Sequence, residues 1–278
     1  KTAYEMLRSL VGSEMCIRAR PGAAREDLFL GHGGAGVSAE KEIPLGLPDE
    51  LIYNPGGLAV LWAHENSREA LFDAMRRREA YGTSGPRIIS RFFAGWDFPA
   101  NLCEAPNRIE RAYAGGVPMG SILPNERGAH TRPTFLVTAS QDAGTSTTPG
   151  TPLQRLQVIK GWVDKLGQTY EQVFDVALSA GRVVSPVTGK APPVGSTVDL
   201  SSPSYSNNIG EVQFTTVWTD PSFDPEMPAF YYVRVLEIPT PRWTAYDASY
   251  FNLELPEYVP MVTQERAYTS PIWFTPER

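Results

Sequence analysis

The stretch "LQVIKGWVDKLGQTYEQVFDVALS", residues 156–179, decides the fold class. It holds two runs that are rich in β-branched and aromatic residues, a composition typical of strands. A polar segment from Lys165 to Thr169 separates the runs. Two strand-like runs joined by a short polar turn predict a β-hairpin, and therefore an antiparallel sheet.

Five further segments have the same strand-like composition, and polar or Pro/Gly-rich turns separate them. The 25 prolines and 24 glycines of the chain favour many short strands over a helical bundle. Together with the hairpin, these segments predict a mainly β fold with an antiparallel β-sandwich-like C-terminal domain. The five segments are 87–96, 134–140, 211–219, 229–238 and 270–275.

Composition excludes several classes of protein. The chain has 278 residues, a formal net charge of −6 and no basic stripe, so we expect no nucleic-acid partner. No apolar run approaches the roughly 20 residues that span a membrane, so we expect no membrane span. Two cysteines cannot build a disulfide framework, and three histidines argue against a self-contained His-rich metal site.

Residues 54–88, "NPGGLAVLWAHENSREALFDAMRRREAYGTSGPRI", predict a strand followed by a helix. The apolar run 57–63 fits a buried strand. Asn66 is a candidate helix cap, with Glu69 three residues later as its capping-box partner. Gly82 is the expected end of this helix, the one helix that the sequence predicts.

The first eighteen residues, "KTAYEMLRSLVGSEMCIR", have two interpretations. Tyr4, Leu7 and Leu10 are spaced like one face of an amphipathic helix. The string also resembles a translated adapter sequence from shotgun, metagenome-derived assemblies. On that interpretation residues 1–18 are non-native, Cys16 is not a native residue, and native sequence starts near Ala19 and continues upstream in a longer protein.

"GHGGAG" contains a G-x-G-x-x-G match at Gly31, Gly33 and Gly36. A dinucleotide site requires a strand before this motif and a helix after it. Pro44 and Pro48 break the required helix, so we expect a mobile glycine-rich loop instead, with a loop over an active site as the alternative. No nucleotide cofactor is expected.

His64 and Glu65 follow the apolar strand 57–63, and positions just past strand ends often hold functional groups. They are weak catalytic candidates, as is His32. Adjacent side chains on a strand point apart, so exposure at the start of a helix is the favoured interpretation for His64 and Glu65. His130 is a loop histidine without a visible partner.

Other residues carry weaker signals. "GTSGP" at 82–86 is not a G-x-S-x-G elbow, so it predicts a turn from helix to strand. Acidic residues in Pro-rich loops lack a calcium-binding pattern. Four tryptophans within or beside strands predict sandwich core rather than sugar platforms. The acidic residues are Asp224, Glu226, Asp247, Glu254 and Glu257, and the tryptophans are Trp162, Trp218, Trp243 and Trp273.

Long blocks of the chain resemble the domain-of-unknown-function family numbered 3604. The resemblance begins with residues 54–88 and continues through "RLQVIKGWVD", "PPVGSTVDL", "TTVWTDPSFDPEMPAFYYVRVLEIPTPRWTAYDA" and "QERAYTSPIWFTP". It covers nearly everything from about Glu26 to Pro276. That family is similar to the polymerase-and-histidinol-phosphatase superfamily of metal-dependent hydrolases. The resemblance implies a distorted β/α barrel with divalent metals, followed by a β-rich region.

The chain departs from that superfamily where the metal ligands are expected. It has no His-x-His and no Asp-x-His, so no metal ligand can be assigned to it. The resemblance then implies three segments: 1–18 as the adapter-derived part, 19–82 as the C-terminal remnant of a metallohydrolase barrel (a strand plus one helix), and 83–278 as a β-rich domain. On this interpretation Leu58, Val60 and Leu71 would expose apolar faces.

The expected function follows from this resemblance. The chain would be the C-terminal fragment of a hydrolase that uses metal-activated water on a phosphoester, ester or carbamate. The complete protein would hold zinc, manganese or iron and bind a small-molecule substrate, while the fragment itself would hold no cofactor and be inactive. A periplasmic or secreted location would require an export signal upstream. The alternative is a non-catalytic β-sandwich module that binds glycans or protein partners.

Overall fold

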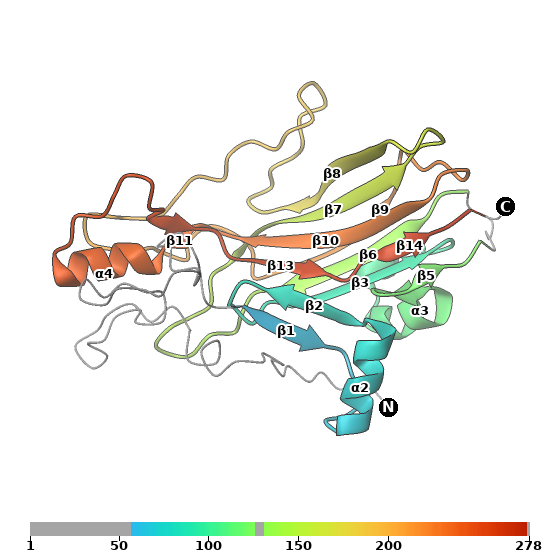
Figure 1. Cartoon of the computed structure of the whole chain (residues 1–278), viewed down its shortest axis with the longest axis horizontal. Helices are drawn as coiled ribbons and strands as arrows, with labels where there is room; N and C mark the ends of the chain where they lie inside the picture. The colour runs from blue at the N-terminus through green and yellow to red at the C-terminus, as the bar shows by residue number, and fades with distance from the viewer. Residues whose placement is uncertain (1–56, 126–130, 277–278) are drawn as a thin grey trace, which may run out of the picture.

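The computed structural model describes residues 57–125 and 131–276, which form two packed β-sheets (Figure 1). The large sheet has eight strands, and β10 is its central member. The small sheet has four strands in the order β4-β3-β6-β9. All pairings are antiparallel except the one between β14 and β5. The mainly β, sandwich-like fold predicted from the sequence is therefore confirmed, and the described residues form no closed barrel.

One edge of β10 (Ala229–Glu237) pairs along its length with β7 (Leu153–Val163), which pairs in turn with β8 (Thr169–Leu178). The other edge pairs with two short strands, β13 and β14. β13 continues the sheet through β2 to β1, and β14 continues it to β5. These short strands are β13 (Arg266–Thr269), β14 (Ile272–Phe274), β2 (Ala80–Thr83), β1 (Leu58–Leu61) and β5 (Ile122–Leu123).

The seven predicted strands are all present. β7 and β8 form the predicted hairpin, and Asp164 and Gln168 close its turn with a backbone hydrogen bond of 3.0 Å. The small sheet contains three of the predicted strands and the short β4. Its strands are β4 (Val117–Pro118), β3 (Ile89–Gly95), β6 (Thr134–Ser140) and β9 (Gln213–Thr219).

The core lies between the two sheets. In β10 the side chains alternate, so Tyr231, Val233 and Val235 are buried while Phe230 is exposed. Tyr231 packs against Phe135 of the small sheet, with ring centroids 4.6 Å apart. This alternation is the physical reason that the two sheets stack face to face.

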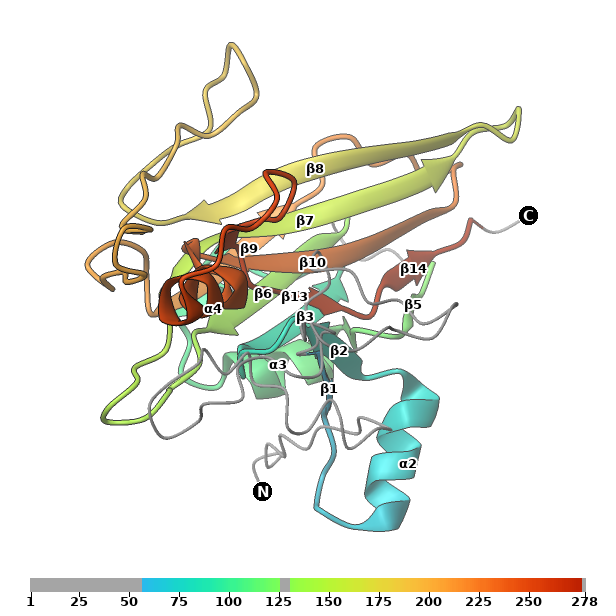
Figure 2. The same ribbon diagram turned by 60° about the vertical axis from the view of Figure 1, so that its left-hand side comes forward.

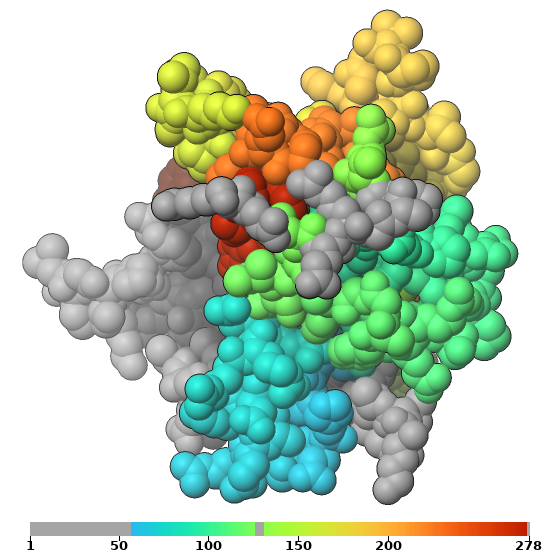
Figure 3. All heavy atoms as spheres, turned by 90° about the vertical axis from the view of Figure 1, so that its right-hand side faces the viewer, coloured from blue at the N-terminus to red at the C-terminus, as the bar shows by residue number. Residues whose placement is uncertain are grey.

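Two short helical elements cover the outer face of the small sheet. They are η1 (Ala100–Glu104) and α3 (Arg108–Gly115). Leu102 and Ala112 from these elements pack on Phe93 and Leu136 in a second hydrophobic cluster. Figure 3 shows this region in green beside α2, which is in blue-green below the sheets.

The predicted helix is α2 (Arg68–Arg77), but its caps differ from the prediction. The cap is Ser67, whose side chain accepts a hydrogen bond from the Ala70 amide, and Asn66 has no such role. The helix ends at Arg78 in the left-handed conformation, four residues before Gly82. It ends early because the following residues, 80–83, are needed as strand β2.

The apolar strand 57–63 is part of the large sheet. β1 and β2 pair with each other, and β2 pairs with β13, so Thr83 lies opposite Ala267 across the sheet. Val60 is buried in the core, so the predicted exposure of its apolar face is wrong. Helix α2 packs on the outer side of these strands and projects from the sandwich (Figure 2).

Helices other than α2 were not predicted from the sequence. α3 is amphipathic but only eight residues long, and α4 (Trp243–Phe251) has apolar residues on several sides and shows no clear helical period. α4 lies at the end of the large sheet, between the two strands of the short antiparallel pair β11 (Thr240–Pro241) and β12 (Val262–Thr263) in the sequence. None of the described helices is long and apolar enough to cross a membrane.

Candidate functional site

The residues that sequence patterns favoured do not form a site. His64 and Glu65 are exposed in the bend between β1 and α2. Within residues 57–125 and 131–276, no three His, Cys, Asp or Glu side chains are placed to hold a metal ion, and this includes the five loop acids. His32, His130, Cys16 and the glycine-rich loop 31–36 lie outside the described residues.

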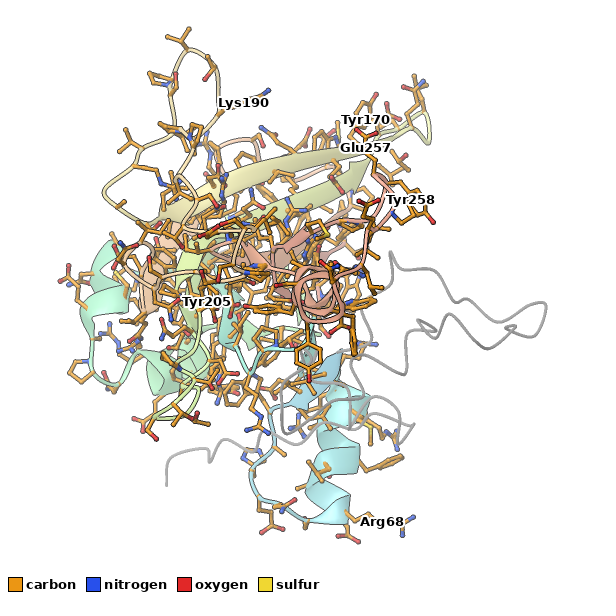
Figure 4. All side chains as sticks on the ribbon, turned by 90° about the vertical axis from the view of Figure 1, so that its left-hand side faces the viewer. Arg68, Tyr170, Lys190, Tyr205, Glu257 and Tyr258 are labelled. Carbon is orange, nitrogen blue, oxygen red and sulfur yellow. The ribbon has the colours of Figure 1, made fainter. Side chains whose placement is uncertain are left out.

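A different group of polar residues gathers at one end of the sandwich, which we call the polar end. It is the end where β2 and β10 finish, β13 begins and α4 lies (Figure 4). We define it by five residues that five different segments supply: Ser84, Asp142, Glu237, Arg242 and Glu265.

Ser84 follows β2 and contacts the segment before β13. Its hydroxyl donates a hydrogen bond to one carboxylate oxygen of Glu265 and accepts one from the Arg266 amide at 2.8 Å. The other Glu265 oxygen accepts a hydrogen bond from the Thr263 hydroxyl at 3.3 Å. The "GTSGP" segment thus joins strand to strand, and Ser84 is held as a structural hydrogen-bonding group.

Glu237 is the last residue of β10 and is 2% exposed. Its side chain points between the sheets, and its Oε1 atom has no hydrogen-bond partner among the described residues. Burial raises the pKa of its carboxyl to about 9, and the negative charges of Glu265 and Asp142 add to this effect. Glu237 is therefore protonated at neutral pH, and it can donate a proton or a hydrogen bond.

Arg242 is a buried cation at the polar end. It donates a hydrogen bond to the Thr244 hydroxyl at 3.4 Å, and its guanidinium lies over the Trp243 ring, 4.8 Å from the centroid. Burial lowers its pKa, while the charge of Glu265 opposes that shift. The polar end thus places a neutral acid and a carboxylate near a guanidinium, which is chemistry suited to binding a polar or charged group.

The first described residues lie beside the polar end. Leu58 is paired with Thr83 across β1 and β2, and Ser84 is the next residue after Thr83. The Thr83 carbonyl oxygen lies 3.7 Å from where a Cβ on Gly57 would be. Gly57, where the described residues begin, therefore lies beside the polar end.

Two other buried polar networks serve packing. Lys160 and the Tyr231 hydroxyl both contact the Asp220 carboxylate, each at 2.7 Å. In the second network, the Tyr113 hydroxyl bridges Glu79 and Arg91. In both, each charged group has a charged or hydroxyl partner, so these networks are internally satisfied.

The prediction for the tryptophans is correct in most cases. Trp243 is 3% exposed, and Trp162 and Trp218 are partly buried against the main core. Trp273 is half-buried on the outer face of the large sheet, where the Arg78 guanidinium lies 5.1 Å from its ring centroid.

Sequence reasoning missed Glu237, although a signal was present. In "AFYYVRVLEI" the alternation of β10 places Glu237 on the same face as Val233 and Val235. A glutamate in register with core residues predicts a buried carboxyl. Only the tertiary structure shows that Glu265 and Asp142 lie near it.

Comparison with known protein families matches residues 11–276 to a family described as "Protein of unknown function (DUF3604)". The match begins inside the segment 1–18 that resembles adapter sequence. No curated protein and no solved structure matches the chain.

Proposed function

Because the chain belongs to the DUF3604 family of proteins of unknown function, we propose that it is the C-terminal β-sandwich part of a metal-dependent hydrolase. The complete protein would use metal-activated water to cleave a phosphoester, ester or carbamate. Two features support this proposal: the resemblance of residues 54–88 and later blocks to this family, which is similar to a superfamily of metal-dependent hydrolases, and the polar end of the sandwich.

The described residues do not themselves fit a catalytic metal. The Glu265 carboxylate accepts hydrogen bonds from the Ser84 and Thr263 hydroxyls, and no three His, Cys, Asp or Glu side chains in the described part of the chain are placed to hold an ion. We therefore assign no step of hydrolysis to these residues. In the proposal, the metal ligands come from the polypeptide that precedes the sandwich.

We propose that the sandwich positions polar groups of a preceding catalytic domain, and one observation supports this role. Residue 57 lies beside the polar end, where Glu237 keeps a proton at neutral pH and Arg242 supplies a positive charge. A preceding catalytic domain would face this end. Glu237 and Arg242 would then position the polar groups of that domain, and they would not contact the reacting atoms.

The first test is the metal content of the purified 278-residue chain after brief exposure to zinc, manganese and iron, together with hydrolysis of p-nitrophenyl phosphate and p-nitrophenyl acetate. We expect no stoichiometric metal and no turnover. The same assays on a chain extended upstream at its locus are expected to give bound metal and hydrolysis. Metal and turnover in the 278-residue chain, or neither in the extended chain, would refute the proposal.

A second function, a non-catalytic binding module, is favoured by a separate observation. The outer face of the large sheet carries Phe230, Tyr232 and Tyr268 side by side, and Phe230 and Tyr268 are 38% and 37% exposed. Exposed aromatic groups on a sheet are typical of ligand-binding faces. Binding at this face would be compatible with hydrolysis elsewhere in a longer protein.

A further inference from the structure

The three aromatic rings form a continuous strip on the outer face of the large sheet, which we call the aromatic strip. Phe230 and Tyr232 belong to β10, and their ring centroids lie 6.4 Å apart with planes inclined by 13°. Tyr232 and Tyr268, on neighbouring strands, have centroids 6.3 Å apart. Neither tyrosine hydroxyl is hydrogen-bonded to a described residue, so both remain available to a ligand.

The neighbouring strand β7 is shaped to accommodate this strip. Gly161 lies opposite Phe230, and a Cβ at Gly161 would lie 2.3 Å from the Phe230 ring. Any side chain at Gly161 would therefore displace the ring. Because Gly161 has none, the ring lies over the β7 backbone and presents an apolar surface outward.

A positioned cation adjoins the strip. Arg234 lies on the same face, two residues after Tyr232 and directly opposite Tyr268. Its Nε donates a hydrogen bond to Gln157 Oε1 at 2.7 Å. The two terminal amino groups of its guanidinium have no hydrogen-bond partner among the described residues, and no acidic side chain there is paired with them.

The acids on this face are already occupied or lie at its edge. Asp175 accepts hydrogen bonds from Gln157 at 2.8 Å and from Arg155 at 3.2 Å, so its charge is balanced and it fixes the Gln157 amide. Glu171 lies on the edge strand β8, opposite Gly161. Burial raises the pKa of the Tyr232 hydroxyl, and the negative charge of Glu171 raises it further while Arg234 lowers it, so Glu171 borders the strip at Tyr232. The two terminal amino groups of Arg234 therefore lie beside the aromatic rings without an acidic partner among the described residues. They form a local positive site on a chain whose net charge is −6.

We propose that this face binds an acidic sugar, with the pyranose ring stacked on Tyr232 and its carboxylate held by Arg234. The apolar face of a sugar ring packs on an aromatic ring, and a carboxylate accepts two parallel hydrogen bonds from a guanidinium. The Tyr268 hydroxyl borders this position and would hydrogen-bond a sugar hydroxyl. This inference rests on the binding-module function and names its ligand class.

The test is isothermal titration of the 278-residue chain with trigalacturonic acid and, separately, with the neutral sugar maltotriose at 150 mM salt. We expect binding of the acidic trisaccharide and at least tenfold weaker binding of the neutral one. Arg234→Gln and Tyr232→Ala should each weaken acidic-sugar binding about tenfold or more. Arg234→Lys, which keeps the charge and loses the fork, should give an intermediate affinity.

Tyr258→Ala is the matched control, because Tyr258 is an exposed tyrosine in the loop after α4 and is not part of the strip (Figure 4). It should bind like the parent chain, and circular dichroism should show that every variant is folded. No binding of either sugar by the folded chain would overturn both the binding-module function and the ligand assignment. Equal binding of the two sugars, or unchanged affinity in Arg234→Gln, would overturn only the acidic-sugar assignment.

Discussion

The Nζ of Lys160 lies 2.7 Å from Oδ2 of Asp220, and both side chains are almost completely buried. Lys160 belongs to the large sheet and Asp220 follows the last strand of the small sheet. The ion pair therefore joins the two layers of the sandwich. Tyr231 completes it by donating a hydrogen bond to the same carboxylate oxygen.

Removing one charge of this pair should destabilise the protein strongly. Asp220→Asn leaves the Lys160 ammonium buried without its counter-charge, which costs roughly 3–5 kcal/mol. Urea denaturation would measure the loss. The chain supplies a matched control in Lys165 and Glu226, which lie 2.6 Å apart but are about 70% exposed. Glu226→Gln should leave the denaturation midpoint unchanged, and equal losses in the two variants would contradict this account.

Stability should fall as pH rises because of Glu237. Its folded-state pKa of about 9 lies above the ordinary value of 4.5, so the folded state binds more protons than the unfolded state between those pH values. The contribution of the neutral carboxyl is complete below about pH 4.5 and is lost as pH approaches 9. Glu237→Gln should thus raise the urea midpoint at pH 8 and change it much less at pH 5.

The control for this prediction is Glu257→Gln, at an exposed position after α4 (Figure 4). It should follow the parent chain at both pH values, because an exposed carboxyl has similar surroundings in both states. If Glu237→Gln and the parent chain lose stability equally from pH 5 to pH 8, Glu237 does not keep its proton when folded.

Gly120 should tolerate no side chain. Its φ is +87°, and a Cβ there would lie 2.2 Å from the Arg78 carbonyl oxygen at the end of α2. Gly167 in the β7–β8 turn has a similar φ of +81° but open space around it. Gly167→Ala should cost about 1–2 kcal/mol for the left-handed conformation alone, and Gly120→Ala should cost clearly more. Similar melting temperatures for the two variants would show that the backbone near Arg78 moves without penalty.

The start of α2 offers a test of the observed cap. Ser67→Ala removes the acceptor of the Ala70 amide and should cost about 1 kcal/mol of stability. Asn66→Ala should have no measurable effect, because the Asn66 side chain does not cap the helix. The reverse order of effects in thermal unfolding would restore the cap assignment that the sequence favoured.

The strands were predictable because their information is local. β-branched and aromatic residues are concentrated in segments such as 134–140 and 229–238, and Pro- and Gly-rich turns mark their ends. The two-residue period of segment 229–238 also predicts the burial of Glu237. The end of α2 was not predictable, because residues 80–83 satisfy their backbone hydrogen bonds with β1 and β13, and β13 lies far away in sequence.

By itself, then, the sequence determined the mainly β class, the β7–β8 hairpin and the positions of seven strands, since each depends on neighbouring residues. Only the tertiary structure decided which strands share a sheet. It therefore also decided which residues meet at the polar end and beside the aromatic strip. Glu237 meets Glu265 and Asp142, and Arg234 meets Gln157 and Tyr268, through pairings between distant segments. The free energy of such contacts depends on burial and distance in space, and neither is encoded in a local pattern of residues.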